Sequence, residues 1–143
     1  MSSIPVPATE VRVELEKVLS SGTFKTSSRS SNLLRFLVEQ TLAGNAANLK
    51  DYTLGAEALG RGVDFDPRTD PIARAEVSRL RSRLELYYSK EGLSDTLLIT
   101  VPKGNYVPIF EARPFNSDRS SHALSGSRKK LLWGALVVLT LVA

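Results

Sequence analysis

The residues with the most evident chemistry lie between Pro71 and Lys90, where arginines and serines are concentrated. The basic residues of this segment are Arg74, Arg79, Arg81, Arg83 and Lys90, and its acids are Glu76 and Glu85. Five basic and two acidic residues give the segment a net charge of +3. Guanidinium groups donate hydrogen bonds to phosphate oxygens and to guanine edges, and serine hydroxyls bind either. The segment therefore has the composition of a nucleic-acid contact.

A helix is expected to present these side chains. Asp70 followed by Pro71 is a strong start signal, because aspartate accepts backbone N–H groups and proline suits the first helical position. One stripe of the predicted helix is apolar and should face the core; it consists of Ala73, Val77, Leu80, Leu84 and Tyr87. The opposite side carries Arg74, Ser78, Arg81 and Ser82, with Arg79 on a flank. Such a helix fits the major groove of DNA.

A solvated amphipathic helix would give the same pattern. In that interpretation Arg81 pairs with Glu85 and Arg79 with Glu76, and each pair contributes about 0.2–0.5 kcal/mol. Tyr88, at the edge of the apolar stripe, is the one aromatic side chain left as a partner-binding candidate. The order of the surrounding elements decides between the two interpretations.

Three further helices and a hairpin are predicted around this segment. Apolar residues recur at helical spacing in residues 9–19, 33–42 and 52–59. Two β-rich runs, residues 97–101 and 106–110, flank a turn at 102–105 with Lys103 at its tip. Pro108 makes the second strand an edge strand. The expected fold class is mainly α with a C-terminal β-hairpin, that is, a winged helix-turn-helix.

Two stretches carry a family resemblance. Residues 77–85 (VSRLRSRLE), followed by residues 99–106 (ITVPKGNY), resemble the end of an OmpR/PhoB-type winged-helix domain. The resemblance covers about residues 30–110. The layout is similar to the membrane-anchored ToxR/CadC branch. It is closer still to the N-terminal domains of bacterial membrane proteins that carry TolB-like or tetratricopeptide segments.

The resemblance implies double-stranded DNA as the partner and assigns roles to individual residues. Arg79 and Arg81 match the basic pair that flanks the recognition-helix leucine. Thr100 matches a phosphate-contacting threonine, and Lys103 falls in the wing turn. The loop at residues 60–70 occupies the place where the family meets RNA polymerase. The chain departs from the family in its N-terminal helix, which replaces a four-stranded sheet, and in Pro71, which replaces an arginine.

The expected function is that of the DNA-binding domain of a membrane-anchored bacterial transcription regulator. The recognition helix 71–90 would enter the major groove and the wing 97–110 would meet the backbone. The candidate DNA-binding residues are Arg74, Ser78, Arg79, Arg81, Ser82, Thr100 and Lys103. Pairing of two copies on two half-sites is compatible with this function.

Two other functions are compatible with the same helix. The alternative is a winged-helix protein-interaction module of a membrane signalling protein without DNA binding, which the prolines at 71 and 102 and the nearby acids favour. A weaker interpretation brings the basic helix to anionic lipid.

The C-terminal part of the chain has a different composition. We expect a domain at residues 1–110, a polar flexible linker at 111–130 and an uncharged segment at 131–143. This segment is shorter than the roughly 20 apolar residues that a spanning helix needs. We interpret residues 131–143 as the start of a truncated transmembrane helix; the alternative is a short hydrophobic tail that lies at the bilayer surface. Three basic residues precede it and should keep the N-terminal domain cytoplasmic. The expected localisation is single-pass in the inner (cytoplasmic) membrane.

Other chemistry has little support in the sequence. The chain has no cysteine, which excludes disulfides, thiolate metal sites and cysteine nucleophiles. Asp64, Asp66 and Asp70 do not form a calcium loop, because the glycine and the glutamate that such a loop needs are replaced by Thr69 and Ala75. We therefore expect no enzyme, no cofactor and no metal site.

Overall fold

The first helix, α1 (Ala8–Ser20), begins after Pro7, whose carbonyl accepts the N–H groups of Glu10 and Val11. The computed structural model describes residues 5–114 of the chain. In α1 the apolar residues Val11, Leu15 and Val18 repeat at helical spacing, and all three are buried. The helix predicted for residues 9–19 is therefore confirmed.

Two helices follow, of which one was not predicted. The short helix α2 (Gly22–Lys25) follows α1 almost directly. The Glu91 carboxylate accepts the N–H groups of Gly22 and Thr23 at 2.9 and 2.8 Å, so a distant residue supplies the partners that begin α2. In α3 (Ser28–Leu42) the Ser27 hydroxyl accepts the N–H of Ser30, which caps the first turn.

The predicted short helix at 52–59 is divided into two pieces. A 3₁₀ turn, η1 (Ala46–Asn48), leads into α4 (Asp51–Thr53), which continues as the π-helical segment η2 (Leu54–Ala58). The Phe65 ring packs directly against the backbone of Gly55, where a Cβ atom would lie 2.2 Å from the ring. The Phe65 side chain thereby covers η2 and fixes the loop that follows.

The long helix α5 (Ile72–Ser89) follows the predicted pattern closely. The Asp70 carboxylate accepts the N–H of Ile72 at 3.1 Å, as expected for a capping residue. All five residues of the predicted apolar stripe are buried: Ala73, Val77, Leu80, Leu84 and Tyr87. Tyr88, left open as a partner contact, is buried as well, so that interpretation is wrong.

A two-stranded antiparallel hairpin completes the described chain. Strand β1 (Leu97–Thr100) pairs with β2 (Ile109–Ala112), with Leu97 opposite Ala112 and Thr100 opposite Ile109. The first strand was predicted correctly, whereas the second begins three residues later than the predicted 106, and Pro108 lies before it. Proline has no N–H to donate to a strand ladder, so pairing begins only beyond it. The fold class, mainly α with a C-terminal β-hairpin, is confirmed.

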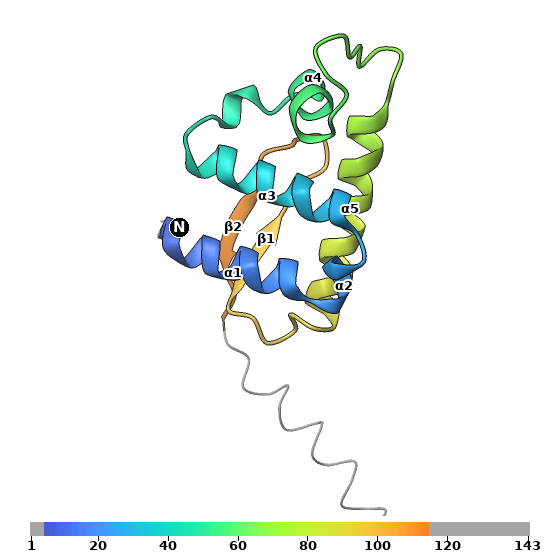
Figure 1. Ribbon diagram of the computed structural model, residues 1–143. Helices are drawn as coiled ribbons and strands as arrows, with labels where there is room; N and C mark the ends of the chain where they lie inside the picture. The colour runs from blue at the N-terminus through green and yellow to red at the C-terminus, as the bar shows by residue number, and fades with distance from the viewer. Residues whose placement is uncertain (1–4, 115–143) are drawn as a thin grey trace, which may run out of the picture. The chain divides into compact units, whose positions relative to one another are not determined.

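The helices and the hairpin share one core. In Figure 1, α1 and α3 cross in front of the hairpin and α5 runs along one side. Helix α3 packs on α5, and both α1 and α5 contact β1. The core residues from α3, Leu33, Leu34, Leu37 and Val38, have no exposed surface. The compact unit ends at Arg113.

A polar cluster lies beneath α1, with Glu14 buried and Lys17 at its exposed edge. The Tyr88 hydroxyl donates to Glu14 Oε1 at 3.0 Å and accepts the N–H of Ile99 at 2.9 Å. Lys17 Nζ lies 3.3 Å from both Glu14 and Asp95, and the Tyr87 hydroxyl donates to Asp95. The cluster joins α1, the end of α5 and the first strand.

The two carboxyl groups of this cluster titrate differently. Burial, together with the adjacent Asp95, raises the pKa of Glu14. Burial alone would raise the pKa of Asp95 too, but hydrogen bonds from Tyr87, Glu14 and Lys17 outweigh it and hold that pKa below its usual range. Asp95 is therefore the group of the pair that ionises more readily, and Glu14 is the group that retains a proton more readily.

The expected membrane localisation needs correction. Within residues 5–114, no helix combines the length and the apolar composition that crossing a bilayer requires, a finding against the single-pass membrane protein that the sequence suggested. The segment 131–143, to which the transmembrane helix was assigned, and most of the expected linker at 111–130 lie outside the described residues.

Candidate nucleic-acid interface

The outer face of α5 carries four of the predicted DNA-binding residues. Arg74, Ser78, Arg79 and Ser82 are all exposed. The side chains of Arg74 and Arg79 are 71% and 66% exposed, so both guanidinium groups are accessible to a ligand. The α-helical period places Arg74, Ser78 and Ser82 opposite the buried stripe and Arg79 on a flank, as the sequence indicated.

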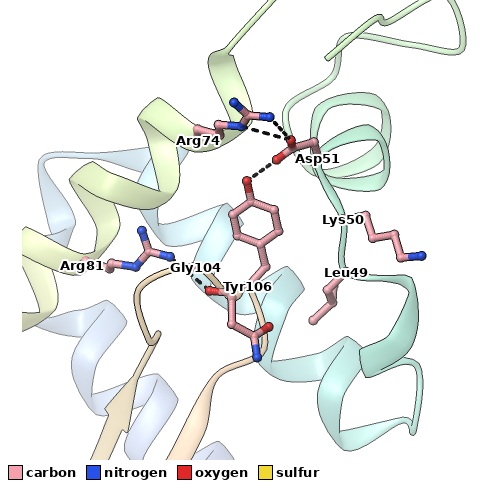
Figure 2. Close-up of a pocket in the computed structure, with 8 residues that line it drawn as sticks. Leu49, Lys50, Asp51, Arg74, Arg81, Gly104 and Tyr106 are labelled. Carbon is pink, nitrogen blue, oxygen red and sulfur yellow. Dashed lines mark hydrogen bonds and ion pairs between the residues drawn. The ribbon is translucent and has the colours of Figure 1, made fainter. Parts of the chain in front are cut away.

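Arg74 is already bound to an acid. Its Nε and Nη2 atoms donate to Asp51 Oδ2 at 3.1 and 3.0 Å, and the Tyr106 hydroxyl bonds the other carboxylate oxygen (Figure 2). Burial, together with the Asp51 carboxylate, raises the pKa of Tyr106 to about 12, so Tyr106 remains a hydrogen-bond donor. Asp51 at the start of α4 thus connects α5 to the loop of the hairpin.

Arg79 shares a buried carboxylate with a residue that sequence reasoning missed. Arg79 Nη1 hydrogen-bonds Glu76 Oε1, as the i,i+3 spacing predicted. Arg29 of α3 approaches the same oxygen at 3.3 Å. The Glu76 side chain is only 4% exposed, so one buried negative charge faces two accessible arginines. Because Arg29 lies far from Glu76 in the sequence, no local spacing could have indicated this contact.

Arg81 is placed differently from the sequence expectation. We expected an outward side chain that reads DNA or pairs with Glu85. Instead the Arg81 guanidinium turns to the hairpin loop and donates to the carbonyl oxygens of Val101, Pro102 and Asn105 at 2.9, 2.9 and 3.0 Å. Arginine accommodates this arrangement because its planar fork presents several N–H donors at fixed angles.

The hairpin carries two more predicted residues, Thr100 at the end of β1 and Lys103 in the loop that follows. Lys103 and Thr100 are exposed, and Lys103 forms no ion pair with any residue in 5–114. Gly104 has a φ of +76°, which permits the tight turn beside Lys103. Between this loop, α4 and α5 lies a hollow of ≈ 550 Å³. Its lining includes Lys50, whose side chain extends away from the ion-paired residues (Figure 2).

A shallow groove of ≈ 380 Å³ lies on the exposed side of α5 itself. It is lined by Ser78, Arg79, Ser82, Arg83 and Leu86. Arg83 donates to the Thr23 carbonyl at 2.6 Å and so fixes α2 against one wall of the groove. Leu86, 45% exposed, adds an apolar surface and was not among the predicted DNA-binding residues. The groove combines hydroxyl, guanidinium and aliphatic groups, which are three of the kinds of side chain that contact base edges.

The loop at residues 60–70 contains its own ion pairs. Arg61 lies 3.3 Å from Asp70, and Arg68 bonds Asp66 at 3.2 Å. These contacts and the cap of α5 account for two of the three aspartates that resembled a calcium loop. Val63, 82% exposed, stands out of this loop as an apolar tip.

Comparison of the chain with models of protein families, with curated proteins and with solved structures gives no match.

Proposed function

We propose that residues 5–114 form a winged helix-turn-helix domain that binds double-stranded DNA as part of a transcription regulator. Helix α5 is the recognition helix, and the loop at 101–108 within the predicted wing 97–110 contacts the phosphate backbone; from here on, this loop alone is called the wing. An α-helix fits the major groove, which is about 12 Å wide. The order of the elements supports this assignment, because α3, α4 with η2, a loop, α5 and a hairpin is the order of a winged helix.

One observation carries the proposal: the contact of Arg81 with the wing carbonyls. Because these bonds join the wing to α5, Lys103 at the wing turn and the exposed side of α5 belong to one surface. On that surface Arg74, Arg79 and Lys103 supply charges for phosphates, and Ser78 and Ser82 supply hydroxyls.

The experiment is a titration of the full chain with a fluorescent random-sequence duplex at several salt concentrations. If Arg74, Arg79 and Lys103 neutralise one phosphate each, the slope of log affinity against log salt should be about −2.7 per monomer. Arg79→Ala and Lys103→Ala should each make the slope less negative by about 0.9. Arg12→Ala is the matched control, since Arg12 is also an exposed arginine in an ion pair, with Glu39 on α3.

Absence of binding at low salt would contradict the proposal. So would a slope that Arg79→Ala and Lys103→Ala leave unchanged while Arg12→Ala alters it. Either result would move the DNA contact away from α5 and the wing.

A second candidate, a protein-interaction module, rests on the acids that already pair with the arginines. Asp51 holds Arg74 and Glu76 holds Arg79, which lowers the positive potential that DNA would meet. If this function is correct, the chain should bind no DNA duplex. It should also still bind its protein partner after Arg79→Ala and Lys103→Ala.

The proposal includes two protein contacts. The loop at 60–70, with Val63 at its tip, is the surface for RNA polymerase. Two copies of the domain would occupy two half-sites, since one small domain covers little DNA. Analytical ultracentrifugation with a duplex carrying one or two copies of a selected site would measure the stoichiometry.

A further inference from the structure

Arg81 is the principal connection between α5 and the wing. The strand ladder pairs Leu97–Thr100 with Ile109–Ala112 and does not extend into residues 101–108. Within the wing the N–H of Asn105 reaches the Pro102 carbonyl only at 3.3 Å, and the N–H of Val107 is bound by the Asn105 side chain at 3.1 Å. The three bonds from Arg81 are shorter, and they reach both sides of the turn.

The chemistry of these bonds makes them strong. A charged guanidinium donates to neutral carbonyls, and charge-assisted bonds are roughly twice as strong as neutral ones. Val101, one of the acceptors, is buried, and Arg81 itself is partly buried, so water competes less for these donors. A second tether, from Tyr106 to Asp51, holds the far side of the wing to α4 (Figure 2).

We infer that Arg81 is a positioning residue, which fixes the wing relative to α5 and reads no base. This inference rests on the proposed DNA-binding function and assigns the specificity within it. Two of the Arg81 nitrogens are bonded to wing carbonyls, so the guanidinium cannot turn to a guanine edge without releasing the wing. Base reading then falls to the groove on α5, where the Ser78 and Ser82 hydroxyls are exposed.

The first test needs no DNA. Amide hydrogen exchange of the full chain should be measured for wild type, Arg81→Ala, Arg81→Lys and the control Arg79→Ala. The amides of Asn105 and Val107 should exchange about tenfold faster in both Arg81 variants, because lysine keeps the charge but lacks the fork. Arg79→Ala should leave them unchanged. Amides of the buried part of α3, followed in the same samples, report whether each variant is folded.

The second test uses duplex DNA and a double-mutant cycle between Arg81 and Lys103. In the wild-type background Lys103→Ala should weaken binding several-fold, whereas in the Arg81→Ala background its effect should fall to less than half as much. Selection from a random duplex library should return the same preferred bases for Arg81→Ala as for wild type, and altered preferences for Ser82→Ala.

The outcomes separate this inference from the proposed function. Faster wing exchange in a protein that binds no DNA would contradict the proposed function and retain the positioning of the wing by Arg81. Unchanged wing exchange, or loss of one base preference in Arg81→Ala, would overturn the inference and return Arg81 to base reading.

Discussion

The Tyr88 hydroxyl has two partners, and its removal should destabilise the protein measurably. Tyr88→Phe keeps the ring, which is packed in the core at 7% exposure, and deletes only the oxygen. That oxygen donates to Glu14 Oε1 at 3.0 Å and accepts the N–H of Ile99 at 2.9 Å. The substitution therefore leaves a buried carboxyl oxygen and a buried backbone N–H without their partner.

The magnitude follows from these two groups. A hydrogen bond to a charged group contributes about 1.5–3 kcal/mol, and an unsatisfied buried N–H costs about 1–3 kcal/mol. Because the raised pKa of Glu14 favours its neutral form and the two effects overlap, we expect a loss of about 2–4 kcal/mol in the free energy of unfolding. The loss should come without a change in the denaturant dependence of that free energy, since the folded surface is unaltered.

Urea unfolding followed by circular dichroism measures the effect. Tyr52→Phe is the matched control, because the Tyr52 hydroxyl donates a single bond, to the Val63 carbonyl at 3.0 Å, from a side chain that is 46% exposed. The free energy of unfolding of Tyr52→Phe should fall by less than about 1 kcal/mol. The reasoning is refuted if Tyr88→Phe is destabilised no more than Tyr52→Phe.

Two further predictions concern the same region. The folded-state pKa of Glu14 is raised, so its contribution to stability is full below the pKa of an unfolded glutamate, about 4.3, and is lost as the pH rises through the folded-state pKa. The folded-state pKa of Asp95 is lowered, so its contribution is lost as the pH falls through that pKa. The measurement is the unfolding midpoint as a function of pH. Glu14→Gln should abolish the loss of stability at rising pH and keep the loss of stability in acid. A wild-type midpoint that does not depend on pH would contradict this. Gly92→Ala should cost about 1–3 kcal/mol, because the new Cβ would lie 2.3 Å from the buried Tyr87 ring. Gly22→Ala, where the nearest atom lies at 3.5 Å, should cost clearly less, and equal thermal midpoints for the two variants would show that the ring adapts.

Local signals were sufficient for most of the helical part of the fold. The period of the apolar residues located α1, α3 and α5, and Asp70 marked the start of α5 within two residues. These features depend on neighbours along the chain, which the sequence displays directly. Helix α2 could not be found in this way, because the partner of its first N–H groups is Glu91, far along the chain.

The candidate site was predictable in position and less so in its contacts. Arg74, Ser78, Arg79 and Ser82 are exposed as the helical wheel indicated, since exposure follows from the period. The direction of the Arg81 guanidinium depends on where the loop after Thr100 folds back, and the second strand lies three residues later than its β-rich composition indicated. Contacts between elements of this kind are set by tertiary packing and leave no trace in local spacing.

The hydroxyl of Tyr88 also constrains when the molecule can assemble. It joins Glu14, near the beginning of the chain, to Ile99, near the end of the described part. A ribosome delivers the N-terminal helix well before the strand it rests on. Helix α1 can therefore meet α2 and α3 early, but its contacts with β1 and with the Tyr88 hydroxyl form only after residue 99 has been synthesised. Completion of the core during synthesis is consequently a late event for this domain.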